Sequence, residues 1–201
     1  IILNYTNVCI TDCKFCAFYR PPNHEEAYTL TLDEIEARVK TGWDMFKIRQ
    51  VLIQGGHNPK LGIEYYEDSF KMIRSKFPNV GVHGLSTSEI VMIATVEKSS
   101  TKEILSRLKD AGLQSVPGAG AEILTDSVKE IISPKKIDSD DWIRIMKESF
   151  ELGLPASATM MYGHVETDND IVEHYDKIAK LQKDLNGFMA LFHGVLNQTI
   201  L

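Results

Sequence analysis

The chain has 201 residues, of which 43% are hydrophobic and 25% are charged, as is usual for a globular protein. Its formal net charge of −6 argues against a nucleic-acid-binding surface, which normally carries a basic excess. No apolar run approaches the roughly 20 residues of a membrane-spanning helix, and the first residues lack the basic segment of a signal peptide. We therefore expect neither nucleic acid nor a membrane as a partner.

Short apolar runs bounded by turn residues predict six β-strands. They alternate with stretches of helical periodicity, so we expect a parallel α/β sheet, open or closed, in a single domain of residues 1–201. Several runs are continuously apolar, as is typical of strands buried on both faces. The predicted strands are residues 1–5, 50–54, 80–85, 114–116, 156–161 and 187–192.

The helices between these strands have recognisable first residues. Thr31 and Glu34 have the spacing of a capping box before an apolar stripe, and the pattern is repeated from Ser100. Ser139 and Asp168 are expected to open two further helices, each with apolar residues along one side.

Cys9, Cys13 and Cys16 directly follow the first predicted strand and are the only cysteines of the chain. An odd number so close together fits reduced thiols in the cytoplasm better than a disulfide framework. Thiolates favour iron–sulfur clusters or zinc, and three of them leave a metal position open for chemistry. Two alternatives stay open: a structural zinc site completed by His24, and an iron–sulfur electron carrier, which would need a fourth cysteine.

Further candidate residues follow the later strands. Gly55 and Gly56 end the second strand, where they would let the backbone approach a ligand closely. Ser86 and Glu89 follow the third strand. Glu122 follows the fourth, where it would bind a hydroxyl, act as a base or cap the next helix. The carboxyl ends of parallel strands share one face, so we expect these residues near the cysteines.

Another group follows the fifth strand. His164 would titrate near neutrality and is a candidate acid or base, although a hydrogen-bonded structural histidine fits equally well. Gly163 and Glu166 flank it. Arg20, beside the cysteines, is a candidate cation for an anionic substrate group.

The spacing C-x3-C-x2-C after the first strand of an α/β chain resembles the signature of the radical S-adenosylmethionine (SAM) superfamily. The resemblance implies a partial (βα)6 barrel of the TIM type and a [4Fe–4S] cluster held by Cys9, Cys13 and Cys16. It also implies that SAM binds the fourth iron and is cleaved to a 5′-deoxyadenosyl radical, which abstracts a substrate hydrogen atom. The SAM contacts that we predict on this basis are Phe15, Gly55, Gly56, Ser86, Glu89, Gly163 and Glu166.

Longer segments resemble the enzymes of the futalosine route to menaquinone and their deazaflavin-cofactor relatives. These segments are residues 4–9, 13–20, 28–30, 117–124 and 163–167. Within that group, residues 54–56, 132–136 and 158–163 are most similar to the cyclic dehypoxanthinyl futalosine synthases. Aminofutalosine synthases and deazaflavin-cofactor synthases are the alternatives.

This closer resemblance implies an intramolecular reaction. The radical would remove a ribose hydrogen from dehypoxanthinyl futalosine, and the carbon radical would add to the benzoate ring to form a spiro ring system. Loss of an electron and a proton would then restore aromaticity. Glu122, His164 and Arg20 are the predicted catalytic residues, with Arg20 holding the substrate carboxylate. The implied partners are this nucleoside-derived small molecule and a flavodoxin- or ferredoxin-type electron donor.

Two segments depart from the family. Residues 41–49 stand where a Gly-Gly turn is usual, and residues 191–201 where the family has an apolar strand and a Pro/Gly-containing loop. We expect the first departure to perturb only the bottom face and the second to change adenine or substrate contacts. We also expect residues to be missing before the first strand and after the sixth, which would leave an open side with exposed apolar edges.

Overall fold

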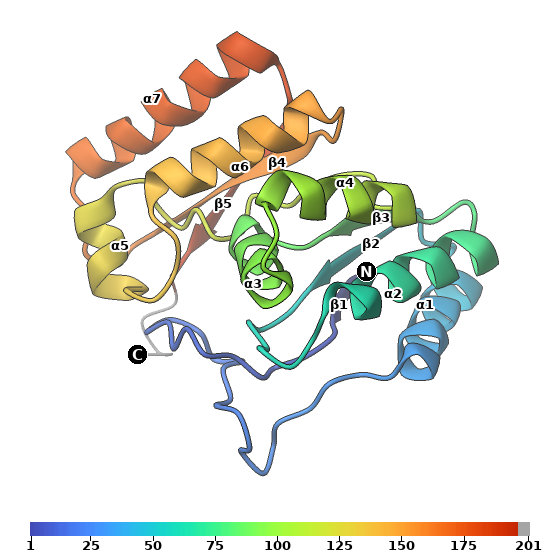
Figure 1. Cartoon of the computed structure of the whole chain (residues 1–201). Coiled ribbons are helices and arrows are strands. Elements are labelled where there is room, and N and C mark those ends of the chain that lie inside the picture. Colours follow the sequence, from blue (N-terminus) through green and yellow to red (C-terminus); the bar gives the residue numbers. More distant parts are fainter. Residues whose placement is uncertain (197–201) are drawn as a thin grey trace.

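The computed structural model describes residues 1–196, in which parallel strands form a curved series with helices on its outer side (Figure 1). β1 (Ile2–Asn4) pairs with β2 (Gln50–Gln54), and β2 pairs with β3 (Gly81–Gly84). β4 (Ala156–Tyr162) pairs with β5 (Phe188–Val195). All of these pairs are parallel, which confirms the predicted fold class of a parallel α/β array of the partial-barrel type.

The fourth predicted strand, residues 114–116, is wrong as a strand. Ser115 forms an isolated parallel bridge to β3 and Val116 forms one to β4. Pro117 follows directly and has no backbone N–H with which to continue a ladder. The segment still lies between β3 and β4, so the strands keep the order expected of a partial barrel.

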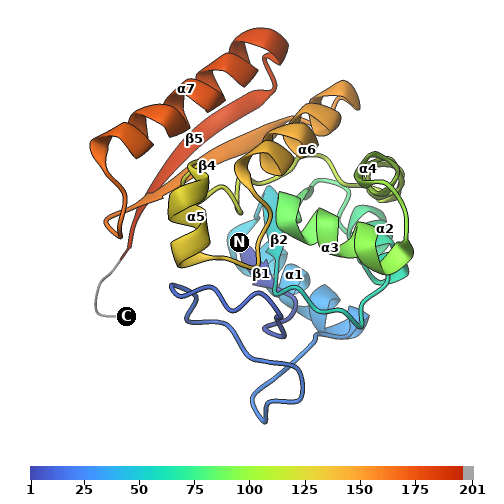
Figure 2. The same ribbon diagram turned by 60° about the vertical axis from the view of Figure 1, so that its left-hand side comes forward.

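The described helices cover the outer side of the strands (Figure 2). None of them is both long and apolar enough to cross a membrane. In chain order they are α1 (Leu32–Phe46), α2 (Ile63–Lys76), α3 (Thr87–Glu97), α4 (Thr101–Ala111), α5 (Asp126–Ile132), α6 (Ser139–Glu151) and α7 (Asp168–Leu185).

The predicted helix starts are confirmed, with one difference in capping. Thr31 forms the expected capping box at the start of α1. α6 and α7 begin at Ser139 and Asp168, and the residue before each accepts a backbone N–H with its side chain. Ser100 also caps α4 by accepting the N–H of Glu103. The carboxylate of Glu103 was expected to accept the N–H of Ser100, but it accepts the hydroxyl of Ser99 instead.

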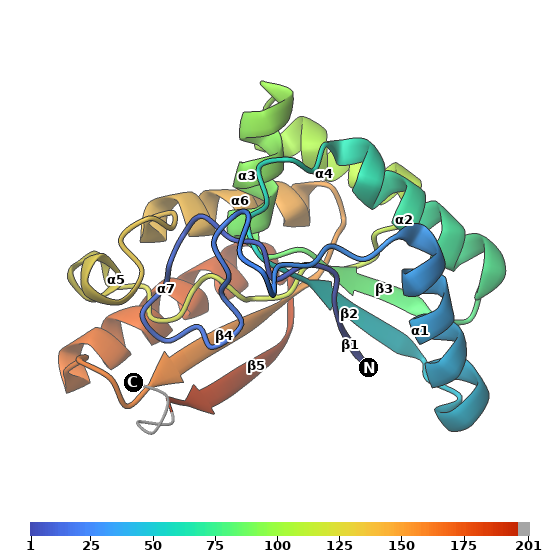
Figure 3. The same cartoon turned by 90° about the horizontal axis from the view of Figure 1, so that it is seen from below.

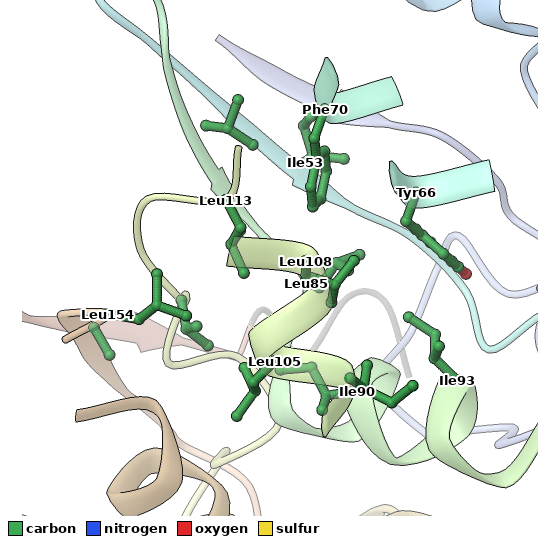
Figure 4. Close-up of a cluster of buried hydrophobic side chains, with 14 of the residues drawn as sticks. Ile53, Tyr66, Phe70, Leu85, Ile90, Ile93, Leu105, Leu108, Leu113 and Leu154 are labelled. Carbon is green, nitrogen blue, oxygen red and sulfur yellow. The ribbon is translucent and has the colours of Figure 1, made fainter. Parts of the chain in front are cut away.

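An apolar core fills the space between the strands and the outer helices (Figure 4). Ile53 of β2 is 2% exposed, and Phe70 of α2, Ile90 of α3 and Leu105 of α4 are fully buried. The helices bury the outer face of β2, where Val51 and Ile53 alternate with less buried residues.

Most of the first divergent segment belongs to α1. The helix runs on to Phe46, and Lys47 ends it with φ of 49°, in the left-handed conformation that glycine usually supplies. Met45 and Phe46 stay exposed there. The departure thus lies at the amino end of β2, opposite the strand ends that lead to the cysteines.

The second divergent segment partly continues β5, which reaches Val195 rather than the predicted end at residue 192. Residues 197–201 lie outside the described part of the chain. Phe192 and Val195 are 59% and 66% exposed, and Ile2 on β1 is 64% exposed. The two outer strands therefore present apolar side chains to solvent, as expected for an array with an open side.

Glu166 fastens the turn between β4 and α7. Its carboxylate accepts the backbone N–H groups of Gly163 and His164. Nε2 of His164 contacts the Met161 carbonyl at 2.9 Å, and Nδ1 lies 2.9 Å from the Glu166 carboxylate without the alignment of a hydrogen bond. Burial raises the pKa of Glu166, but the backbone N–H groups outweigh it and hold the pKa below its usual value.

Replacing Leu105 by alanine should lower the free energy of unfolding by about 2–5 kcal/mol, because it removes buried methyl groups and leaves a cavity. Chemical denaturation measures the change. Met45→Ala is the control, since this side chain is 68% exposed and its loss should cost less than about 0.5 kcal/mol. Equal losses in the two variants would contradict the assignment of the core.

Replacing Glu166 by glutamine should cost about 1–3 kcal/mol at neutral pH, because hydrogen bonds to a charged acceptor are lost. The folded-state pKa is depressed, so this stabilisation is present above the unfolded value of about 4.3 and disappears as pH falls through the folded value. Urea denaturation at several pH values should show the wild type and the variant converging in acid. Glu130→Gln, at an exposed site on α5, should change little at any pH, and parallel curves for E166Q and wild type would refute the role.

Candidate active site

The cysteines lie on the connection between β1 and α1, which Figure 3 shows in blue reaching towards α5. The N–H of Cys9 donates to the carbonyl of Arg20 at 2.9 Å, and the N–H of Arg20 donates to Asn7 at 3.0 Å, which closes residues 9–20 into a loop. The N–H of Lys14 donates to the carbonyl of Ile132 in α5 at 3.0 Å. The connection is thus fixed at its base and at its tip.

The thiols differ in their surroundings. Cys9 and Cys13 are each 8% exposed, whereas Cys16 is exposed. Sγ of Cys9 accepts the backbone N–H of His57 at 3.3 Å and lies 3.0 Å from Oγ1 of Thr11. Burial raises the pKa of the Cys13 thiol, with the nearby Lys136 ammonium and Thr11 acting in the opposite direction. The protein therefore already directs a backbone donor at one of the sulfur atoms.

A cavity of about 700 Å³ opens where β1, β2, β3 and β4 end. The three thiols face it, and so do most of the other residues that the sequence analysis selected. The predicted residues on its wall are Cys9, Cys13, Cys16, Phe15, Gly55, Gly56, Ser86, Glu89 and Glu122. The expectation that strand ends gather these residues is confirmed, while the individual roles stay predictions.

Gly55 and Gly56 allow β2 to end against the cysteine loop. A Cβ on Gly56 would stand 2.2 Å from the carbonyl oxygen of Val8 and 2.9 Å from Cβ of Cys9. A Cβ on Gly55 would stand 2.8 Å from the ring of Tyr5. The N–H of Gly55 donates to Glu89 and the N–H of Gly56 donates to the carbonyl of Thr6, so any further ligand contact at these glycines needs their carbonyl oxygens or Cα atoms.

Glu89 is 3% exposed and joins three strand ends. Oε1 accepts the hydroxyl of Tyr5 at 2.8 Å and the N–H of Gly55 at 2.9 Å. Oε2 accepts the N–H and the hydroxyl of Ser86 at 2.7 and 2.6 Å. Burial raises the pKa of Glu89 despite these donors. Ser86 and Glu89 form a capping box for α3, a Ser-x-x-Glu signal that the sequence analysis missed.

Glu122 faces the cavity with φ of 44°, an uncommon conformation for a residue with a side chain. Oε1 accepts a hydrogen bond from Nζ of Lys136 at 2.8 Å, and Nζ of Lys129 lies 3.7 Å from Oε2. Within residues 1–196, Oε2 has no hydrogen-bond partner. Burial raises the pKa of Glu122, but the two lysines outweigh it and keep the carboxylate ionised. Oε2 is thus a buried acceptor that faces the Lys129 ammonium.

Four predicted residues lie outside this cavity wall. Nε of Arg20 pairs with Glu26 at 2.6 Å and its guanidinium also binds carbonyls of its own loop, so a substrate carboxylate would have to displace Glu26. Gly163 and His164 instead line a second cavity of about 380 Å³ that shares only Phe15 and Leu196 with the first. Glu166 lines neither cavity and holds the turn described above.

Three residues in or beside the cavity were not predicted from the sequence: His57 and Lys136, which line it, and Lys129, which lies next to Glu122. Burial lowers the pKa of His57 to about 3, so its ring is neutral. Lysines normally lie on the surface, and no periodic signal marks these two as buried. Only the resemblance of residues 132–136 to one group of enzymes drew attention to that segment.

The thiols fit an iron–sulfur cluster better than zinc. In the part of the chain that the structure describes, no three His, Cys, Asp or Glu side chains converge on a site for one metal ion. Iron–sulfur clusters are held by cysteine thiolates, so a donor set of three thiols on one loop suits a cluster. His24 lies outside the cavity wall, and its Nδ1 accepts the N–H of Glu26.

Comparisons with known proteins agree with this chemistry. Residues 3–178 match the model of the radical SAM superfamily. A cyclic dehypoxanthine futalosine synthase of Halalkalibacterium halodurans is 39% identical over 188 residues, which are 94% of this chain and 50% of that protein. A 5-amino-6-(D-ribitylamino)uracil–L-tyrosine 4-hydroxyphenyl transferase of Methanopyrus kandleri is 38% identical over 186 residues, 92% of this chain and 50% of that protein. The chain thus spans about half the length of these relatives.

Among solved structures, methylornithine synthase matches with a TM-score of 0.74 at 11% identity, covering 98% of this chain and 52% of that one. At this identity the match bears on the fold alone. Since the superfamily match extends from β1 into α7 and includes the whole cysteine loop, the chain belongs to the radical SAM superfamily.

Proposed function

We propose that this radical SAM enzyme cyclises dehypoxanthinyl futalosine in menaquinone biosynthesis. One observation carries the proposal: residues 132–136, which resemble the cyclic dehypoxanthinyl futalosine synthases, pack on the cysteine loop. Ile132 accepts the N–H of Lys14, Nζ of Lys135 lies 3.9 Å from Asp12, and Nζ of Lys136 lies 5.6 Å from the ring centre of Phe15. The segment that distinguishes the group therefore lies against the predicted cofactor site.

In this proposal Cys9, Cys13 and Cys16 hold a [4Fe–4S] cluster. When bound, the cluster supplies the electron that cleaves SAM, which starts removal of a hydrogen atom from the substrate. Gly55 and Gly56 keep the end of β2 against the cysteine loop, and Glu89 fixes that end from α3. The chain thus provides a preformed wall rather than a reacting group at these positions.

The remaining task of the protein is to position two parts of one substrate against each other. The cavity of about 700 Å³ is in the usual range for small-molecule sites. Met160, Met161 and Phe192 give it apolar surface that limits access of water. Glu122 lines this cavity, and we place its carboxylate beside a hydroxyl group of the bound nucleoside. Holding a sugar carbon and an aromatic ring at contact distance contributes most to such a reaction.

The proposal also places the enzyme in the cytoplasm with a flavodoxin- or ferredoxin-type electron donor. The three cysteines must stay reduced to bind iron, which the cytoplasm ensures. We also propose His164 as an acid or base and Arg20 as the cation that binds the substrate carboxylate. His164 would act through the turn beside the second cavity, and Arg20 would act after release from Glu26.

The full chain, reconstituted anaerobically with iron and sulfide, should convert dehypoxanthinyl futalosine to its cyclic form and SAM to 5′-deoxyadenosine when a reductant is added. Mass spectrometry follows both products. Cys13→Ala should reduce both to background, because one cluster ligand is lost. A parallel reaction with 5-amino-6-(D-ribitylamino)uracil and L-tyrosine tests the activity for which the Methanopyrus kandleri relative is named. Product formation only there, or 5′-deoxyadenosine without cyclised product, would overturn the cyclase assignment.

Replacing Gly56 by alanine should push the cysteine loop away from β2, because the new Cβ has no room beside Val8 and Cys9. We expect a loss of about 1–3 kcal/mol in the free energy of unfolding and less iron per chain after reconstitution. Iron analysis and chemical denaturation measure the two effects. Gly194→Ala is the matched control on the same cavity, since its Cβ would lie 4.0 Å from its nearest neighbour. Equal iron content in G56A and G194A would contradict the close-approach argument.

A further inference from the structure

Lys129, Lys136 and Glu122 form a buried charge cluster beside the cysteine loop. Their side chains are 4%, 14% and 8% exposed. Nζ of Lys129 is also held by the carbonyl oxygens of Gly120 and Ala121, at 2.8 and 3.4 Å. Two cations share one carboxylate, so the group carries an excess positive charge. Burying such an excess is costly unless a negative charge lies nearby.

Lys136 is the member of this group that faces the thiols. It lines the main cavity together with Cys9, Cys13 and Cys16, whereas Lys129 does not. Its ammonium lies 5.6 Å from the ring centre of Phe15, the residue between Cys13 and Cys16. The N–H of Lys14 donates to the carbonyl of Ile132, which holds this stretch of chain against the loop. The position of Lys136 is therefore fixed by its contact with Glu122 and by the attachment of its segment to the cysteine loop.

A cluster held by three thiolates supplies the missing negative charge. Three thiolates give the oxidised cluster a net negative charge, and an incoming electron increases it. Reduction potentials of such clusters depend on net charge and on nearby groups. A fixed and largely buried cation stabilises the more negative, reduced form and acts more strongly than a cation in solvent.

We propose that Lys136, oriented by Glu122, is a positioning residue whose charge raises the reduction potential of the cluster bound at Cys9, Cys13 and Cys16. The inference rests on the proposed function only in that it requires this cluster. Glu122 has two effects in it: the carboxylate fixes the lysine, and its own charge opposes that of the lysine. Glutamine at position 122 keeps an acceptor for the lysine but removes the opposing charge, so replacing Lys136 and replacing Glu122 by glutamine should shift the potential in opposite directions.

The test is the midpoint potential of the reconstituted full chain without SAM, from a redox titration followed by electron paramagnetic resonance. Lys136→Met should lower the potential by at least a tenfold change in the reduction equilibrium, about 59 mV for one electron. Glu122→Gln should raise it, and Lys136→Arg should leave it near the wild-type value. Lys135→Met is the matched control, since this neighbouring lysine is 60% exposed and should have little effect.

An unchanged potential in K136M, or shifts of the same sign in K136M and E122Q, would overturn the inference. If K136M assembles no cluster, the sign of the shift in E122Q decides, and a zero or negative shift rejects the inference. Failure of the wild-type chain to assemble any cluster would reject the proposed function as well. Opposite shifts in a chain that does not cyclise dehypoxanthinyl futalosine would support the inference and reject only the substrate assignment.

Discussion

The carboxylate of Glu89 accepts hydrogen bonds from Tyr5, Gly55 and Ser86, at the ends of the first three strands. A buried carboxylate is unfavourable without donors, and here each oxygen has two. Tyr5 immediately precedes the cysteine connection, and Gly55 begins the turn that meets it. The backbone ladder places β1 beside β2, and this one side chain joins the ends of both strands to α3, which forms the wall on which the thiols lie.

A second constraint, the lack of side chains at Gly55 and Gly56, acts together with the first. Glu89 binds the N–H of Gly55 at the end of β2. The absence of a side chain on Gly56 lets the backbone there pack directly against Val8 and Cys9. The N–H of His57 then points at Sγ of Cys9. A backbone N–H thus contacts Sγ of Cys9, which is a proposed cluster ligand. The same donor would tune the properties of a cluster bound there.

The sequence was sufficient for the strands, the helix starts and the face on which the cysteines lie, because these depend on local patterns. The sequence was insufficient where tertiary contacts determine strand pairing, the direction of a side chain or its burial. Residues 114–116 stand between turn residues where a strand is expected, yet Pro117 limits them to bridges. Arg20 is close to the cysteines along the chain, but its pairing with Glu26 turns it away from the cavity. Lys136 has no local signal at all, since its burial depends on Glu122, fourteen residues earlier.

The three thiols all belong to one connection that is closed on itself between Cys9 and Arg20. Binding a cofactor there would bring together no distant parts of the chain, so it would add little loop-closure entropy to folding. The strands, the helices and the core involve contacts outside residues 9–20. Ligand binding at these thiols would therefore stabilise residues 9–20 more than the core, with Cys16 as the most exposed of the three thiols.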